Sequence, residues 1–129
     1  RNVVLKPNRH EAVAAIHPEH EGPIDQALAE SCGRALFART GRPVYITLSE
    51  EGMLLITDSG IEHIPAVPVT DNIDPVGAGD STSAGITSAR CAGATWAEAA
   101  MIGNLVASVT VQQLGTTGTA TPEQVKGLI

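Results

Sequence analysis

Aromatic residues are scarce in this chain of 129 residues, where one Trp, one Tyr and one Phe make up 2% of the sequence. Nucleic-acid bases and sugar rings are commonly held against flat aromatic faces. The chain is therefore poorly equipped for stacking of that kind, and Ala, Val, Ile and Leu have to build its core. Hydrophobic residues reach 43%, which predicts a globular domain with a core of useful size.

Basic residues are also few. Eight Lys and Arg stand against fourteen Asp and Glu, which gives a formal net charge of −6. This balance disfavours non-specific attraction to nucleic acid or to an anionic membrane. No apolar run approaches the length of a membrane span and no signal peptide is visible, so we expect a cytoplasmic protein. A nucleotide can still bind where backbone donors and a metal ion balance its charge.

Cysteine is represented only by Cys32 and Cys91, which are far apart and in no C-x-x-C arrangement. We expect two buried, reduced thiols, and a disulfide stays open as the alternative. The four histidines form no metal-binding pattern. His17 and His20 lie in a polar loop, where a solvated surface is expected rather than a zinc site.

Hydrophobic periodicity and turn residues predict helices that cover a small sheet, an α/β layered arrangement. We count four or five short strands, among them residues 3–5, 44–48, 53–56 and 61–64. Helices are predicted at residues 9–16, 23–39, 79–92 and 96–114 and after Thr121, with N-caps at Asn8, Thr95 and Thr121. The two long helices are rich in small residues, which would let them pack closely on a sheet. Because the sheet is small, the chain is interpreted as one partial domain over residues 1–129.

The central stretch is DPVGAGDS at residues 74–81. Its Gly-Ala-Gly turn enters a helix, so backbone N–H groups and the positive end of the helix dipole offer a seat for an anion. Gly77 and Gly79 allow close approach of a ligand, and Ala78 keeps the turn narrow. Asp80 would repel an anion unless it accepts a proton from a hydroxyl that attacks it, as in phosphoryl transfer. The alternatives are a tight strand-to-helix turn and a carboxylate that only caps the helix or faces its dipole.

Residues 74–80 (DPVGAGD) resemble the C-terminal signature of the ribokinase-like (PfkB) sugar kinases. Other stretches resemble motifs of that family in the same order along the chain. These are KPNRHE at residues 6–11, TLSEEG at 47–52, Asn104, and VTVQQLG at 109–115. Within the family, residues 49–53, 114–116 and 121–123 look most like the kinase domain of bacterial heptose-phosphate kinase/ADP-heptose synthase. The resemblance implies a ribokinase-like three-layer α/β/α sandwich, represented here by its C-terminal nucleotide-binding part.

The same resemblance implies an ATP-dependent kinase that phosphorylates a hydroxyl of a sugar or sugar phosphate. Asp80 would be the catalytic base. Gly77, Ala78 and Gly79 would form the anion hole for the transferring phosphate.

Three residues and one loop are implied to hold cations. Asn8 and Glu11 would help hold Mg²⁺ and its waters near the phosphates, although a capping pair explains these two residues almost as well. Asp74 and residues 115–119 match positions that bind a monovalent cation, such as K⁺, in many relatives.

Four further residues are implied to contact ATP. Thr47, Ser49 and Gly52 would line the phosphate or ribose region, with Ser49 standing where the family has glycine. Asn104 would lie near adenine. The alternatives are a β-branched strand residue at Thr47 and an interhelical hydrogen bond at Asn104.

The sequence lacks the half that carries most sugar-binding residues in this family. Two other readings therefore stay open. One is a nucleotide-binding module with no catalysis of its own, and the other is a structural piece that is stable only as an oligomer covering its sheet edge. A homodimer is also left open.

Overall fold

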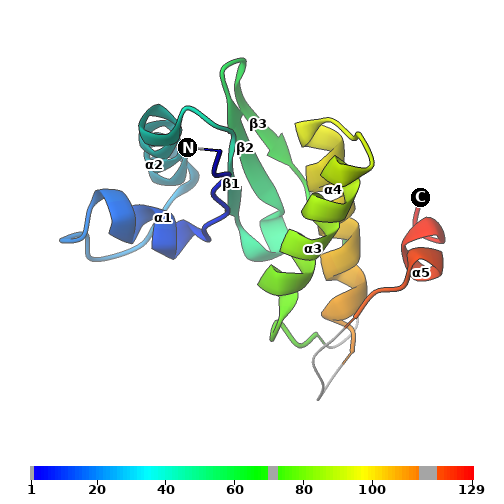
Figure 1. Ribbon diagram of the computed structural model, residues 1–129. Helices are drawn as coiled ribbons and strands as arrows, with labels where there is room; N and C mark the ends of the chain where they lie inside the picture. The colour runs from blue at the N-terminus through cyan, green and yellow to red at the C-terminus, as the bar shows by residue number, and fades with distance from the viewer. Residues whose placement is uncertain (1, 70–72, 114–118) are drawn as a thin grey trace. The chain divides into compact units, whose positions relative to one another are not determined.

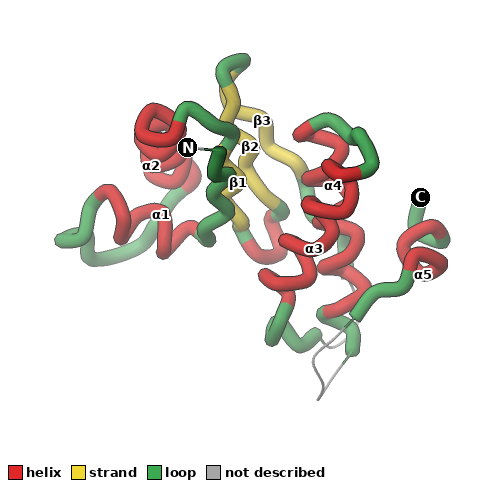
Figure 2. The backbone as a smooth tube through the Cα atoms, viewed as in Figure 1, coloured by secondary structure: helices red, strands yellow, loops and turns green. Residues whose placement is uncertain are grey.

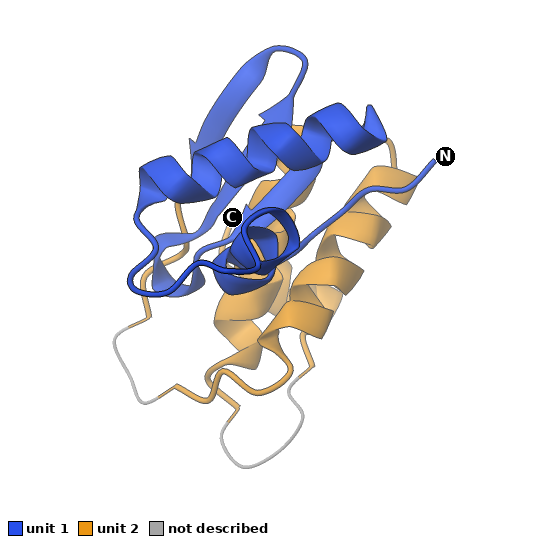
Figure 3. Ribbon diagram, turned by 90° about the vertical axis from the view of Figure 1, so that its left-hand side faces the viewer, with its two compact units in different colours: residues 1–64 blue, residues 65–129 orange. Residues whose placement is uncertain are grey.

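The computed structural model describes residues 2–69, 73–113 and 119–129 (Figure 1). The chain divides into two compact units, residues 1–64 and residues 65–129 (Figure 3). The interpretation of residues 1–129 as one partial domain stays a prediction. Among the helices of the described ranges, none has the length and apolar character needed to cross a membrane.

The first unit consists of two helices and an antiparallel sheet (Figure 2). Its elements are α1 (Arg9–Ile16), α2 (Gln26–Thr40), β1 (Val44–Thr47), the 3₁₀ turn η1 (Ser49–Glu51), β2 (Met53–Thr57) and β3 (Gly60–Ile64). The strands are in the order β1-β2-β3, so each pairs with its neighbour in sequence. The three strands predicted between residues 44 and 64 are confirmed.

The strand predicted at residues 3–5 is wrong. This segment meets β1 only at isolated parallel bridges, so the described part of the sheet has three strands rather than four or five. The N–H of Tyr45 donates to Leu5 O at 2.9 Å and that of Thr47 to Pro7 O at 3.0 Å. Pro7 has no N–H to give to a ladder, which limits the pairing of this segment.

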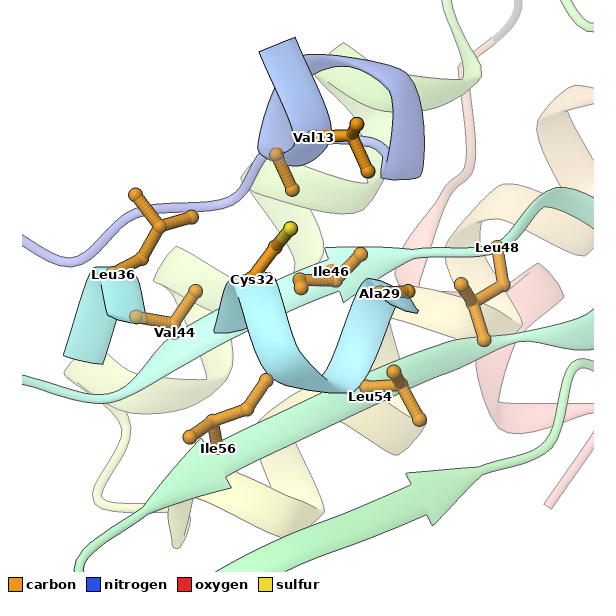
Figure 4. Close-up of a cluster of buried hydrophobic side chains, with 10 residues drawn as sticks. Val13, Ala29, Cys32, Leu36, Val44, Ile46, Leu48, Leu54 and Ile56 are labelled. Carbon is orange, nitrogen blue, oxygen red and sulfur yellow. The ribbon is translucent and has the colours of Figure 1, made fainter. Parts of the chain in front are cut away.

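Alternate side chains of β1 and β2 point toward α1 and α2 and form the core of the first unit (Figure 4). This follows from the two-residue repeat of a strand, which places every second side chain on one face. A Cβ at Gly33 of α2 would lie 2.7 Å from Ile56 Cδ1, so glycine lets this helix approach the sheet closely. The buried members of the core are Ala12, Val13, Ala29, Cys32, Leu36, Val44, Ile46, Leu48, Leu54 and Ile56.

The second unit is built on two long helices, α3 (Ala78–Cys91) and α4 (Trp96–Thr110), followed by α5 (Pro122–Lys126). Small residues let α3 and α4 pack against each other. A Cβ at Gly103 would lie 2.9 Å from Ile86 Cγ1, and one at Gly85 would lie 3.0 Å from Val106 Cγ2. The prediction that these small residues serve packing on a sheet stays a prediction.

The turn between α3 and α4 is held by Arg90. Its guanidinium lies 3.7 Å above the ring of Trp96, and its Nη1 donates to Ala94 O. A cation over an indole face is attracted by the negative face of the ring.

Side-chain caps set most helix starts. Asn8, Thr95 and Thr121 each accept the N–H of the third helical residue, as predicted. The predicted start of α2 is two to three residues too early, because Asp25 Oδ1 accepts the Leu28 N–H at 2.8 Å and caps the helix there.

The end of α4 also differs from the prediction, which extended that helix to residue 114. The helix ends at Thr110, and Gln112 and Gln113 donate to carbonyls three residues back at 3.3 and 3.1 Å. Such i→i+3 bonds tighten the last turn of a helix. Residue 114 lies outside the described residues.

The two cysteines differ in environment. Both are free, and Cys32 is fully buried under α1, where burial raises the pKa of its thiol. Cys91 is exposed, so the prediction of two buried thiols is correct for Cys32 and wrong for Cys91. Cys91 is the last residue of α3 and is followed by an exposed turn, which explains why its side chain is not buried between α3 and α4.

A thiol titration of the native protein is expected to find one fast-reacting cysteine, Cys91, because thiol reactivity depends on exposure and on the thiolate fraction. Cys32 should react only when the protein is unfolded in urea. Measurement with a chromogenic disulfide reagent, and again on a Cys91→Ser variant, checks this. Two fast thiols in the native wild type would contradict the buried position of Cys32.

Candidate functional site

The start of α3 leaves two backbone N–H groups without an acceptor among the described residues, those of Gly79 and Asp80. The N-cap is Gly77, in the left-handed region at φ 80° and ψ −1°, and no side chain caps the helix. The N–H of Ala78 donates to Pro75 O at 3.1 Å, so this donor is occupied. Two N–H groups at the positive end of a helix of 14 residues can bind an anion.

Asp80 lies in the first turn of this helix, at its third residue, and is exposed. The alternative that Asp80 caps the helix is not what the structure shows, because Gly77 is the N-cap. No donor or cation in the described part of the chain contacts the Asp80 carboxylate. A carboxylate and two N–H donors therefore occupy the same helical turn.

Asp74 is fixed in the turn that leads to α3. Its Oδ1 accepts the Val76 N–H at 3.0 Å, and its own N–H donates to Val111 O at 2.6 Å. The first bond is an Asx turn, a local side-chain-to-backbone closure. The second ties the start of the DPVGAGD stretch to the C-terminal end of α4.

The predicted partner of Asp74 in cation binding is residues 115–119, of which 115–118 lie outside the described residues. The residues that flank this gap contact each other. Gln113 Oε1 accepts the Thr119 N–H at 2.8 Å, and Gln113 Nε2 donates to Thr119 O.

Asn104 is buried on α4, and its Nδ2 donates to Pro65 O at 2.9 Å. The sequence predicted a polar partner for this side chain. The partner of its Nδ2 is a backbone carbonyl of the segment after β3. Its predicted place near adenine stays a prediction.

In the first unit, Asn8 and Glu11 form a capping box at the start of α1. Asn8 Oδ1 accepts the Glu11 N–H, and Glu11 Oε2 accepts the Asn8 N–H, both at 2.8 Å. The Glu11 carboxylate is exposed, and its Oε1 accepts no bond within the ranges described. Mg²⁺ commonly binds through one or two carboxylates together with waters and phosphates. The Oε1 atom of Glu11 therefore fits as a ligand of this ion. The described residues contain no cluster of three or more metal-binding side chains.

Thr47, Ser49 and Gly52 lie where β1 turns into β2. Thr47 is bridged in parallel to Asn8, which brings two predicted site residues together. Ser49 has φ 55°, and it is the one non-glycine of the described residues with positive φ. Gly52 has φ 93° and ψ −128°, a conformation that favours glycine. Ser49 thus adopts a left-handed conformation at a position where the resemblance expects glycine.

Comparison with known proteins decides the family. The model of the pfkB family carbohydrate kinase matches residues 3–124. The chain belongs to the pfkB family of carbohydrate kinases. Its relatives include the bifunctional protein HldE of Bradyrhizobium diazoefficiens, 34% identical over 121 residues that cover 93% of this chain and 24% of the relative. The 1-phosphofructokinase of Haloferax volcanii is 38% identical over 120 residues, covering 93% of this chain and 37% of the relative.

The solved structures show the fold of this pfkB chain. The ribokinase of Arabidopsis thaliana, complexed with ribose and ATP, has a TM-score of 0.84 at 21% identity, with 97% of this chain and 40% of that chain covered. The predicted ribokinase-like α/β fold is confirmed. The chain spans about a quarter to two fifths of the length of the proteins it matches.

One residue that the sequence did not single out lies among the candidate residues of the pfkB chain. Arg9 Nη2 donates to Leu48 O at 2.8 Å and to Glu51 Oε1 at 3.0 Å. An open pocket of about 340 Å³ adjoins it, lined by Arg9, His10, Ile24, Ser49, Glu50 and Glu51. The sequence places Arg9 between two motif residues, but only the fold shows a contact with residues about forty positions away.

Replacing Ser49 by glycine and replacing Gly52 by alanine are expected to have different effects on the free energy of unfolding. Ser49→Gly should leave stability unchanged or raise it by up to about 1 kcal/mol, because the left-handed conformation costs a non-glycine residue about 1–2 kcal/mol and glycine loses part of that in chain entropy. Gly52→Ala should destabilise by about 1–3 kcal/mol, since alanine is forced into a glycine conformation. Urea unfolding measures both.

The matched control is Ser31→Gly on the exposed side of α2. There the substitution should lower the free energy of unfolding by about 0.5 kcal/mol, because glycine has a lower helix propensity than serine, and it relieves no backbone strain. Equal destabilisation by Ser49→Gly and Ser31→Gly would contradict a strained Ser49.

Proposed function

We propose that this chain is the C-terminal, nucleotide-binding part of an ATP-dependent sugar kinase. The observation that carries the proposal is the first turn of α3, where a carboxylate and two N–H donors without described partners lie together. Family membership supports it, as do relatives named HldE and 1-phosphofructokinase and a similar structure complexed with ribose and ATP. The substrate is a sugar or a sugar phosphate.

In the proposed reaction, Asp80 accepts the proton of a sugar hydroxyl, whose oxygen then forms a bond to the γ-phosphorus of ATP while the bond to the β-phosphate oxygen breaks. The N–H groups of Gly79 and Asp80 donate to oxygens of the transferred phosphoryl group. Phosphoryl transfer needs mainly positioning and neutralisation of charge. Fixed backbone donors supply both without reorganisation.

Two cations complete the proposal. Glu11, through its exposed Oε1, and Asn8 would hold Mg²⁺ with its waters, while Asp74 and residues 115–119 would hold K⁺. When bound, such ions neutralise phosphate charge. Thr47, Ser49 and Gly52 would line the phosphate or ribose region, and Asn104 would lie near adenine. The Asx turn of Asp74 supports its role by fixing the carboxylate in one orientation.

Asp80→Asn is expected to lower the rate of phosphoryl transfer by about 10²–10⁴-fold in the whole protein, because removal of a general base typically has that effect. Binding of ATP should persist, since the backbone donors stay in place. A coupled kinase assay and calorimetry measure the two quantities. The control Asp58→Asn makes the same charge change in the turn between β2 and β3 and should leave the rate unchanged. Full activity of Asp80→Asn would refute its assignment as the base.

Mg-ATP and Mg-ADP are expected to raise the melting temperature of this chain, because a ligand at 100 times its Kd stabilises the folded state by about 2.7 kcal/mol. Gly77→Val should abolish the shift, since valine is strained at φ 80°. Gly93→Val is the matched control, because Gly93 has φ 94° at the other end of α3 and open space around it. That variant should lose stability but keep the nucleotide shift.

The same experiment separates the remaining alternatives. A shift without phosphorylation of any sugar would favour a nucleotide-binding module. No shift at saturating nucleotide in the wild type would refute nucleotide binding by this chain.

A further inference from the structure

The guanidinium of Arg9 joins two stretches of the first unit that both carry predicted site residues. Arg9 is the first residue of α1 and directly follows Asn8. Its Nη2 reaches Leu48 O, just before Ser49, and the carboxylate of Glu51, at the end of η1. The bond to Leu48 O is partly buried, and the Arg9 side chain is 22% exposed against 51% for Glu51.

The turn that Arg9 contacts has a conformation that needs support. Ser49 is held at φ 55°, which is unfavourable for a residue with a Cβ. Within the turn, the N–H of Glu51 donates to Leu48 O and that of Gly52 to Ser49 O, both at 3.1 Å. From β3, the Nε2 of His63 lies 2.6 Å from Glu51 O. Arg9 thus adds bonds at both ends of η1 while α1 is anchored by its capping box.

From this geometry we propose that Arg9 is a positioning residue of the nucleotide site. It holds the Ser49–Gly52 turn in its left-handed shape and at a fixed place relative to Asn8 and Glu11. The inference rests on the proposed function, in which these residues lie along the ATP phosphates. Arg9 acts through the turn, because the two acceptors of its Nη2, Leu48 O and the Glu51 carboxylate, lie at the two ends of that turn.

The sign of one substitution distinguishes positioning from simple charge attraction. Glu51→Gln removes a negative charge beside Arg9 and frees the guanidinium. If Arg9 attracted phosphates directly, that variant would bind Mg-ATP more tightly. If Arg9 positions the turn, the same variant loosens it and binds Mg-ATP more weakly.

The experiment compares the wild-type chain with Arg9→Met, Glu51→Gln and the control Arg34→Met. Arg34 is exposed on α2 and has no bond to any described residue, so its loss makes the same charge change without touching the turn. Two quantities are measured, the Kd of Mg-ATP by calorimetry and the hydrogen exchange of the Glu51 and Gly52 amides. Folding of each variant is checked by its urea midpoint.

Arg9→Met is expected to weaken Mg-ATP binding about tenfold and to speed exchange of both amides by a similar factor, as loss of a hydrogen-bonded charged group does. Glu51→Gln should weaken binding about two- to fivefold, because the Glu51 carboxylate is half exposed and water screens its ion pair with Arg9. Arg34→Met should change neither quantity.

Tighter binding by Glu51→Gln would overturn the proposal, and so would unchanged amide exchange in Arg9→Met. Faster exchange with unchanged affinity would also overturn it. A wild-type chain that binds no Mg-ATP would instead refute the proposed function. The exchange rates would then still decide whether Arg9 holds the turn.

Discussion

A helix start whose backbone donors have no partner among the described residues is the constraint on which the proposed chemistry depends. The first turn of any α-helix has N–H groups with no partner inside the helix, and they must find one elsewhere. The α-helices α1, α2, α4 and α5 use a side chain for this purpose, from Asn8, Asp25, Thr95 and Thr121 respectively. At α3 the cap is Gly77, which has no side chain to offer. Among these helices of the described residues, α3 is therefore the one that starts without a side-chain cap, which supports the proposed anion site.

The glycine at that position has two effects that work together. It allows the left-handed backbone that turns the chain into the helix, and it has no side chain that could cap the first N–H groups of the helix. Asp74 supports the turn from the other side, through its bonds with Val76 and Val111. The local sequence therefore determines the conformation of the turn and provides no side chain to cap the helix.

Much of the fold could be predicted from the sequence, because local signals determine it. Capping residues mark most helix starts, short apolar runs mark β1 and β2, and an alternating pattern marks β3. The predictions are wrong where the structure depends on a contact between residues that are distant in sequence, or on where a helix ends. Residues 3–5 look like a strand, but their pairing depends on β1 and is limited by Pro7. Cys91 looks apolar enough to be buried, but its exposure depends on where α3 ends.

The residues of the candidate site differ in the same way, because some can be found from the local sequence and others only from the fold. Gly77, Ala78, Gly79 and Asp80 are contiguous, so the sequence alone could single them out as candidate site residues. Arg9 could not be found in this way, because its role depends on contacts with Leu48 and Glu51, which only the fold brings near.

The conformation of Ser49 shows how the fold can preserve a backbone shape when the residue best suited to it is absent. A glycine would adopt φ 55° at no steric cost, whereas serine opposes it by about 1–2 kcal/mol. The bonds that surround the turn, from Arg9, from Gly52 and from His63, have to offset that cost. The proposed site thus depends on the backbone conformation at Ser49, and the hydrogen bonds from the residues around the turn together stabilise that conformation. A substitution at one of these supporting residues can therefore disturb the turn even though Ser49 itself is unchanged.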